Sequence, residues 1–346
     1  MPGFMIFVVM KKSSTIFLLL VFLFILVATD ADAQRWTQRK EYASVGVNVG
    51  AMNYFGDIVP APDFTSLRIK STRPSVGVSY TYRFAPRLSF RGGLNWGRVT
   101  GSDAESASAN EAENEGRFKR NLSFRNDIKE LSGVLIVDLF ENRSVYRRRP
   151  DFVPYGFVGL ALFHHNPKAY YERGSHPGIT AAQDIATGWY ELQPLGTEGQ
   201  YADAGTGEAY PKPYKRIQVA IPFGFGVRYK VDRNWDLSLE IGWRKTFTDY
   251  LDDASSAYAL KADILNGGGS NPRAAAILSD RSAETRLGTI IGDPAGPSVP
   301  YKRLQGYGTP TENPFRGHNS DEDWYISTGI SLNYILATRI RSPKFR

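Results

Sequence analysis

The stretch KRIQVAIPFGFGVRYKVDRNWDLSLEIGWRKTF, residues 215–247, decides the fold. Apolar or aromatic residues take nearly every second position on both sides of one polar break, Asp232-Arg233-Asn234. Because successive side chains of a β-strand point to opposite faces, this period of two predicts two strands joined by a tight turn. Each arm exceeds the about 5–6 residues of a globular strand and reaches the roughly 9–11 that cross a membrane.

The same alternation recurs along the rest of the chain. It predicts eight strands, at residues 42–52, 74–84, 87–99, 130–140, 152–164, 215–231, 235–247 and 324–338. In 130–140 and 152–164 both faces carry apolar side chains, so the pattern there is less clean. Pro222 lies inside a strand, and because proline cannot donate a hydrogen bond to a central ladder, it predicts a bulge.

The connections between these strands alternate in length. Short links cover 85–87, 141–151 and 232–234, and long ones cover 53–73, 100–129, 165–214 and 248–323. An even number of strands, short turns at one end and long loops at the other are typical of outer-membrane barrels. The prediction is therefore an all-β fold: an eight-stranded antiparallel up-and-down transmembrane β-barrel with four long extracellular loops and both termini in the periplasm.

The N-terminus predicts export. Lys11 and Lys12 precede an apolar run at 16–28 and then the small-residue site Ala31-Asp32-Ala33. This order is typical of a signal peptide, here residues 1–33 with cleavage near Ala33, which leaves 34–346 as the barrel. A membrane anchor is the alternative, but the apolar run is short for a spanning helix.

The composition of the chain restricts which ligands and partners are expected. The chain has no cysteine, which excludes disulfides and thiolate metal sites, and its formal net charge is +7. With an export signal, we expect this surplus to face anionic outer-membrane lipid and lipopolysaccharide, and we expect no nucleic acid partner.

A soluble calyx with its apolar face inward is the competing fold. Tyr, Phe, Trp and Leu on nearly every strand would overfill an eight-stranded interior, whereas the Gly-, Ser- and Asn-rich face fits one. We therefore place the polar face in the lumen. Buried charges need partners of opposite sign, and both signs occur on this face in similar number. We therefore expect a lumen that is filled by ion pairs and has no open pore. The charged residues expected to form these pairs are Arg83, Arg91, Glu130, Asp138, Arg228, Glu240 and Arg244.

The apolar face supplies candidate aromatic girdles at the two interfaces with the membrane. We expect Phe84, Tyr229, Trp235 and Tyr334 toward the short turns, and Trp96, Phe163, Trp243, Phe247 and Trp324 toward the long loops.

Catalytic chemistry has little support in the sequence. His164 and His165 are adjacent and would point to opposite faces of a strand, so they cannot chelate one ion. A lipid-modifying barrel enzyme that uses His164 and the loop residue Ser175 is an alternative that no spacing requires. We expect no catalytic site, no metal and no cofactor.

Several segments resemble the PorG-type outer-membrane barrels of Bacteroidetes. They are VGAMNYFGDI at 49–58, NLSFRNDIKELSG at 121–133, VPYGFVGLALFHHNPKA at 153–169 and LEIGWRKTFTDYLDDASSAY at 239–258. The motif residues follow the loop ends of strands, where we expect them to fold the long loops over the barrel mouth: Tyr54, Gly56, Asp57, Asn166, Pro167, Asp249, Tyr250, Asp252 and Asp253. For the four residues at 249–253, loop capping is the expected role in preference to direct binding.

The resemblance implies a component of the type IX secretion and gliding apparatus that ties a periplasmic ring of PorK and PorN type to the outer membrane. Docking would then use the periplasmic side: residues 35–40, the turn at 141–150 and the tail at 339–346. Arg147, Arg148 and Arg149 are the candidate contact with an acidic partner, and lipid headgroups are their alternative partner. A general surface-loop barrel without a secretion role is the alternative function.

Overall fold

The computed structural model describes residues 41–58, 71–107, 115–202, 210–296, 298–310, 315–318 and 322–336. The predicted signal peptide at 1–33, the segment 35–40 and the tail 339–346 lie outside these residues. Within the described part of the chain, no helix is long and apolar enough to cross a membrane.

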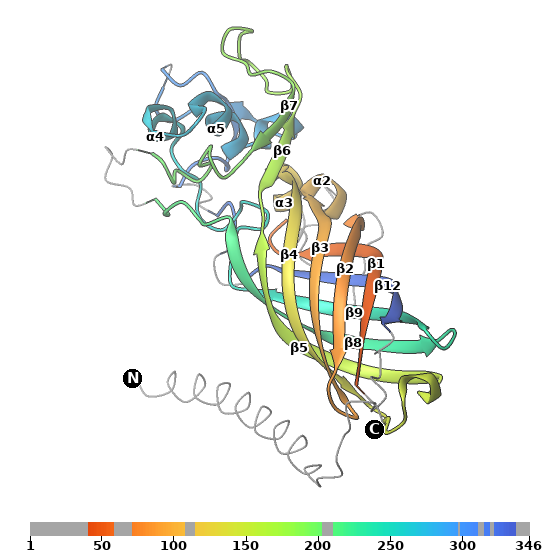
Figure 1. Cartoon of the computed structure of the whole chain (residues 1–346). Helices are drawn as coiled ribbons and strands as arrows, with labels where there is room; N and C mark the ends of the chain where they lie inside the picture. Colours follow the sequence, from red (N-terminus) through yellow and green to blue (C-terminus); the bar gives the residue numbers. More distant parts are fainter. Residues whose placement is uncertain are drawn as a thin grey trace, which may run out of the picture. The chain divides into compact units, whose positions relative to one another are not determined.

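Ten of the described strands form one antiparallel sheet, and eight of these ten close into a barrel (Figure 1). Going round the wall, each strand pairs with its neighbour in the order β1-β2-β3-β4-β5-β8-β9-β12, and β12 returns to β1. The barrel strands are β1 (Tyr42–Phe55), β2 (Arg73–Arg83), β3 (Leu88–Ser102), β4 (Ser123–Asp138), β5 (Phe152–His164), β8 (Ile217–Lys230), β9 (Trp235–Thr246) and β12 (Trp324–Leu336). The predicted eight-stranded antiparallel barrel is confirmed.

The strand that contains Pro222 runs without the predicted bulge. Pro222 pairs with Arg244 of β9 in an unbroken register. Toward β5 the pairing stops at Val158–Phe223 and resumes at Ala161–Ala220 with no residue inserted. Because proline has no N–H to donate, the pairing of β8 with β5 is interrupted beside Pro222, and no extra residue is inserted as in a bulge.

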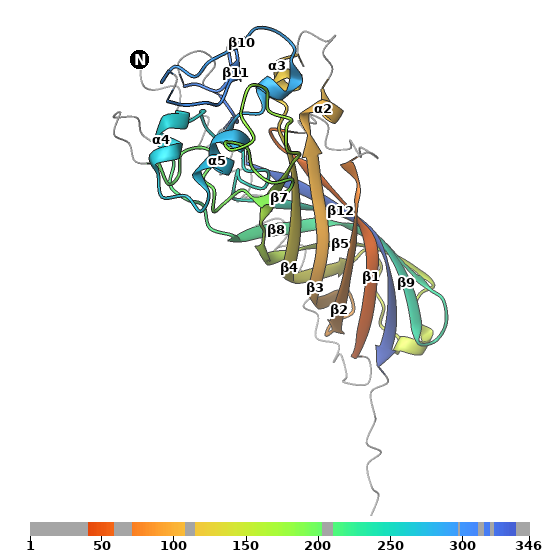
Figure 2. The same ribbon diagram turned by 90° about the horizontal axis from the view of Figure 1, so that it is seen from above.

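One end of the barrel carries short turns and the other carries long connections. The β8–β9 turn closes with Val231 N donating to Trp235 O at 3.0 Å. The first strand begins and the last strand ends at this short-turn end, where Ala43 pairs with Leu336. All four long connections leave from the opposite end (Figures 1 and 2).

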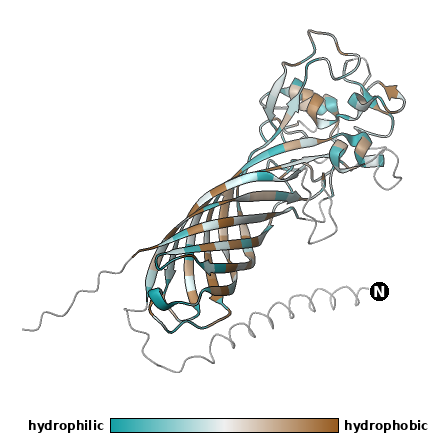
Figure 3. Ribbon diagram, turned by 90° about the vertical axis from the view of Figure 1, so that its right-hand side faces the viewer, coloured by the Kyte–Doolittle hydropathy of each residue, from teal (hydrophilic) through white to brown (hydrophobic). Residues whose placement is uncertain are grey.

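Apolar side chains cover the outside of the barrel wall. Strand pairing aligns Val78, Leu94, Leu131, Leu162 and Val219 in one row across five strands. Each of these side chains is 42–57% exposed, and Figure 3 shows hydrophobic residues recurring along the barrel strands. An exposed apolar surface of this extent marks contact with a membrane or another protein.

The predicted faces of β5 need correction. Phe163, expected in the outer aromatic girdle, is 1% exposed and belongs to a buried core at the barrel mouth. The outward side chains of β5 are instead Val158, Leu160 and Leu162, at 39%, 65% and 51% exposure. Both faces of β5 are apolar because its inner face packs against the interior, so alternation could not identify which face is outward.

The fourth strand begins at Ser123, seven positions before the predicted 130. In this added part the pattern is inverted: Phe124 and Ile128 are buried inward, while Arg125 and Asp127 face outward. Beyond the apolar belt the outer face meets water and the inner face meets loop residues, so the hydrophobic face changes side. For the same reason β1 and β3 extend to Phe55 and Ser102, beyond the predicted 52 and 99.

The two longest connections contain regular structure of their own. Residues 165–216 include the hairpin β6 (Pro167–Tyr171) and β7 (Gly188–Glu191), and β6 extends the sheet from β4. Residues 247–323 include α4 (Lys261–Asn266), α5 (Pro272–Ser279), the short pair β10 (Ile290–Ile291) and β11 (Arg303–Leu304), and a 3-10 turn, η3 (Ser282–Thr285). We call the described parts of these two connections the loop cap (Figure 2).

The loop cap has its own hydrophobic core. Helix α5 begins at Asn271, whose side chain accepts a hydrogen bond from Ala274 N at 3.1 Å, with Pro272 at the first helical position. Its residues 274–278 are buried against Ala169 and Tyr171 of β6 and Tyr301. The side chains of Lys261 and Asp280 pair at 2.9 Å with both fully buried. The cap is therefore a folded unit, whereas the sequence predicted only loops.

Candidate functional site: the lumen and the barrel mouth

The charged residues predicted for the lumen pair with one another. At the short-turn end, Asp138 binds Arg83 at 2.5 Å and Arg228 at 3.0 Å, and Asp138 is 2% exposed. Closer to the long connections, Arg91 binds Glu240, and Arg244 binds Glu130 at 3.3 Å. Each of these charged side chains thereby has a partner of opposite sign inside the wall, as burial requires, with Arg83 and Arg228 sharing Asp138.

The lumen is less polar than the sequence predicted. Val134, Ile136, Tyr155 and Phe157 form a buried apolar cluster on the inner faces of β4 and β5. The hydroxyl of Tyr155 reaches Glu240, and the Arg91 guanidinium lies 5.3 Å from the centre of the Phe157 ring. Aromatic side chains thus fill the space between the two layers of ion pairs.

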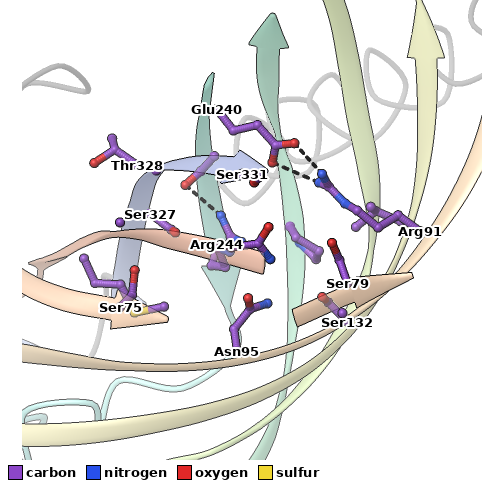
Figure 4. A pocket seen from close by; sticks show the side chains of 18 of the residues that line it. Ser75, Ser79, Arg91, Asn95, Ser132, Glu240, Arg244, Ser327, Thr328 and Ser331 are labelled. Atoms are coloured by element: carbon purple, nitrogen blue, oxygen red, sulfur yellow. Dashed lines mark hydrogen bonds and ion pairs between the residues drawn. The ribbon is translucent and has the colours of Figure 1, made fainter. Parts of the chain in front are cut away.

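A small polar cavity remains between these ion pairs (Figure 4). It has a volume of about 60 Å³ and is lined by Ser79, Asn95, Ser132, Ser331 and the Arg91–Glu240 pair, among others. Such a volume has room for about four water molecules. It could hydrate the charged pairs, but it is too small to form a channel for solutes.

The barrel mouth is sealed by a second buried core. Inward side chains of the strands, such as Met52, Phe163 and Tyr325, meet Leu251 and Ala254 of the loop cap. The Asn126 side chain donates to Leu251 O at 2.8 Å and accepts from Asn166 N at 2.8 Å. The cap is thus bound to the wall by both apolar contacts and hydrogen bonds.

Tyr54 lies between two buried carboxyl groups at the mouth. Its hydroxyl is 2.6 Å from Asp252 Oδ2 and 2.8 Å from Asp323 Oδ1, and all three residues are at most 1% exposed. A hydroxyl has one hydrogen to donate, so the second contact requires a proton on one carboxyl group. This cluster, which we call the Tyr54 triad, joins the end of β1, the loop after β9 and the residue before β12.

Four carboxyl groups at the barrel mouth, those of Asp249, Asp252, Asp253 and Asp323, are hard to ionise. Burial raises the pKa of Asp252 to about 7, that of Asp253 to about 6 and that of Asp249 to about 9. Burial and then the neighbouring charges of Asp252 and Asp249 raise the pKa of Asp323 well above its ordinary value. Near neutral pH the mouth therefore retains protons, in agreement with the geometry of the Tyr54 triad.

Two buried arginines complete the mouth network. The Arg316 guanidinium binds Glu198 at 3.1 Å and Asp253 at 3.5 Å, and Tyr214 also donates to Asp253 at 2.6 Å. The Arg120 guanidinium forms a two-pronged pair with Asp103, at 2.8 and 2.7 Å, and donates to the backbone carbonyl of Asp57 at 2.9 Å. Such forked pairs fix both position and orientation.

The residues predicted to structure the loops meet in this network. Asp57 accepts from His318 N at 2.8 Å, and Pro167 O accepts from Leu192 N at 2.9 Å. Gly56 abuts the Tyr54 hydroxyl and the Asp323 carboxyl group, so a side chain there would collide with the triad. The ring of Tyr250 stacks on Tyr214 with ring centres 4.5 Å apart.

Sequence reasoning missed half of this network. Glu198, Arg316, Asp323, Arg120 and Asp103 lie in connections that the alternation pattern leaves as loops. One sequence feature could have identified them: these connections carry charged residues together with large apolar and aromatic ones, which is typical of segments with a folded core. Tyr258 and Leu278 are examples, and both are at most 2% exposed.

The histidines show no catalytic arrangement. His164 faces outward beside Lys129, while His165 is fully buried and stacked on Tyr214. Burial lowers the pKa of His165 to about 4, so its ring is neutral near neutral pH. No described contact joins His164 to Ser175, and in the described residues no three His, Asp or Glu side chains are grouped to hold a metal ion.

The predicted docking cluster is divided by the structure. Arg147 and Arg148 are exposed in the short 3-10 turn η2 (Tyr146–Arg148), but Arg149 is 4% exposed. Its side chain binds Asp236 at 2.7 Å and donates to the carbonyls of residues 146, 232, 233 and 235 at 2.7–3.0 Å. Arg149 therefore fixes one short turn to the next and is not available to a partner.

Comparison with known proteins gives a family match and similar solved structures. A family model described as "Domain of unknown function (DUF6089)" matches residues 16–186, and no curated protein matches the chain. Among solved structures, the chain is similar to Ail of Yersinia pestis at 6% identity, covering 86% of this chain and 99% of that chain with a TM-score of 0.34. It is also similar to OprG of Pseudomonas aeruginosa at 8% identity, with coverages of 86% and 98% and a TM-score of 0.35. Neisserial surface protein A matches at 9% identity, with coverages of 84% and 96% and a TM-score of 0.32.

Proposed function

We propose that this chain is a non-enzymatic outer-membrane barrel that anchors a periplasmic lipoprotein ring of PorK and PorN type to the membrane. The observation that carries the membrane part is a wall with an exposed apolar outer face around a filled, ion-paired lumen. A soluble barrel would have to leave side chains such as Leu160 and Phe225, each 65% exposed, in water. In lipid the same side chains are in their preferred solvent.

Because the lumen is filled, we infer that the barrel acts through its surfaces and not through a channel. The lumen cavity of about 60 Å³ is far too small for solute passage, which argues against a porin. What the barrel can offer to other molecules is then the short-turn end, the loop cap and the outer wall.

The short-turn end offers a basic surface. Arg147 and Arg148 are exposed on one turn and Arg233 is exposed on the next, while Arg149 and Asp236 hold these two turns together. Exposed guanidiniums on a rigid base suit an acidic protein surface. The resemblance to PorG-type barrels supports assigning this partner to the secretion ring.

The test is a cross-linking pull-down of the tagged protein from solubilised outer membranes. The variant reverses Arg147 and Arg148 to glutamate and leaves Arg149 intact, because changing Arg149 would disturb the turn itself. A matched control reverses Arg173 and Arg286, which are exposed in the loop cap and give the same change of charge. The proposal expects ring lipoproteins with wild type and control but not with the variant. A folded wild-type barrel that recovers no ring lipoprotein contradicts it.

A surface-loop barrel without a secretion role is the second candidate. It is favoured by the loop cap, which has a hydrophobic core and a fully buried Lys261–Asp280 pair. Such order exceeds what a barrel needs merely to connect its strands. Wild-type levels of secretion in cells that lack the protein, together with a pull-down free of ring lipoproteins, would support this candidate.

A further inference from the structure

The outer wall carries two adjoining apolar grooves, each of about 650 Å³. Both include Val47, Val78, Leu94 and Leu131, so they are continuous over β1 to β4, the strands labelled side by side in Figure 1. One groove continues toward the short turns, to Trp235 and Tyr334. The other continues toward the loop end, to Trp96, Lys129 and His164.

The wall is hollow at this place because Gly92 has no side chain to fill it. Gly92 of β3 and Gly133 of β4 are paired, and both face outward. They stand between Tyr80 and Leu160, whose side chains are 51% and 65% exposed. A side chain at Gly92 would meet no other atom within 4 Å. The outer face is therefore open at Gly92, which lines the groove, whereas the ring of Phe90 lies over Gly133, 3.2 Å from where a Cβ would stand.

The loop end of the groove carries an unneutralised lysine. Strand pairing places Trp96, Lys129 and His164 in one row on the outer face, and Lys129 is exposed. No described carboxylate pairs with it. The other outward cations on the described barrel strands at this end have partners: Arg98 binds Asp127 at 2.5 Å, Lys245 binds Glu322 at 2.7 Å, and Arg125 lies over the Trp189 ring at 3.9 Å.

An ammonium group at the head of an apolar groove complements one kind of molecule, an amphiphile with an anionic headgroup. We propose that the groove binds a lipid A-type phosphoglycolipid of the outer leaflet, with its phosphate on Lys129 and an acyl chain along Val78, Leu94 and Leu131. This inference rests on the proposed outer-membrane location, because only there does the loop end meet such a lipid. Lys129 thereby differs from a lysine that merely extends into water, since its position fixes the headgroup above a preformed acyl groove.

The experiment measures retention of lipid A by the protein in nanodiscs of phosphatidylcholine doped with lipid A, read by native mass spectrometry. Loss of one lysine near a membrane surface corresponds to about fivefold weaker binding, which we expect for Lys129→Gln. Gly92→Leu fills the groove without changing charge and is expected to reduce retention as well. Lys245→Gln is the matched control, because Glu322 already neutralises that lysine.

The outcomes separate this inference from the proposed location. Equal retention of lipid A by wild type, Lys129→Gln and Gly92→Leu overturns the lipid site. Equal losses for Lys129→Gln and Lys245→Gln overturn it too, because they would show a general effect of charge. If the wild type fails to insert into lipid vesicles at all, the membrane location itself is wrong. Circular dichroism of each variant checks that the barrel has folded.

Discussion

Replacing Arg149 by alanine is expected to destabilise the protein strongly, although the residue lies in a surface turn. The side chains of Arg149 and Asp236 are 3% and 5% exposed, and the guanidinium also serves four backbone carbonyls. Removing one partner of a buried pair leaves an uncompensated charge, which costs about 3–5 kcal/mol. Arg147→Ala, two residues away and exposed, should stay within about 0.5 kcal/mol of wild type.

Urea unfolding of the two variants in lipid vesicles, followed by tryptophan fluorescence, measures this difference. We expect a lower midpoint for Arg149→Ala with an unchanged slope, and no shift for Arg147→Ala. Asp236→Asn should resemble Arg149→Ala, because it breaks the same pair from the other side. Equal midpoints for Arg149→Ala and Arg147→Ala would refute the assignment of Arg149 as a structural residue.

Three further predictions concern the lumen and the mouth. Glu240→Gln leaves Arg91 without its carboxylate and should cost about 3 kcal/mol in urea unfolding, the lower end for a buried pair, because the two side chains keep 16% and 17% exposure. A loss below about 1 kcal/mol, as for an exposed surface pair, would contradict the role of this pair in the lumen. Gly56→Ala should cost about 1–3 kcal/mol through overpacking against the Tyr54 triad, seen as faster proteolysis of the loop cap while the barrel stays intact. Because the pKa of Asp252 is raised to about 7 in the folded protein, protonated Asp252 stabilises the folded cap. This stabilisation is complete below the pKa of Asp in the unfolded chain, about 4, and is lost as the pH rises through about 7. Cap stability should therefore fall over this range in wild type and fall less in Asp252→Asn, and equal pH profiles would count against the shared proton.

The fold could be predicted because lipid imposes one rule on every strand. Where the outer face meets an apolar solvent and the inner face is polar, as in β2 and β9, strict alternation identifies both the strand and its outward side. The rule fails where the inner face is apolar too. Phe163 lies in the buried core of the mouth and not in a girdle, because the face of β5 that also carries Tyr155 and Phe157 points inward.

The site was predicted only where its residues lie at strand ends. Tyr54, Asp57 and Asp252 were singled out by the resemblance to PorG-type barrels, and their place just beyond strand ends predicted that they fold the loops over the mouth. Their partners Asp323 and Arg316 are brought to the mouth by tertiary packing of the loop cap, and no local period reports such packing. For Arg149 the sequence predicted an exposed residue where the structure has a buried one. Three consecutive arginines were predicted to form one charged surface, but the turn directs the third side chain inward to Asp236.

The central claim, an outer wall in lipid around a filled lumen, can be tested by spin labelling at single cysteines, since the chain has no native cysteine. Labels at Leu160 and Leu162, on the outer face of β5, are compared in lipid vesicles with a label at Ser132, which lines the lumen cavity. We expect lipid-soluble oxygen to relax the two outer labels but not the lumen label, and a water-soluble nickel complex to relax none of the three. Outer labels that respond to nickel rather than oxygen would contradict the membrane barrel, and nickel access at Ser132 would contradict a filled lumen.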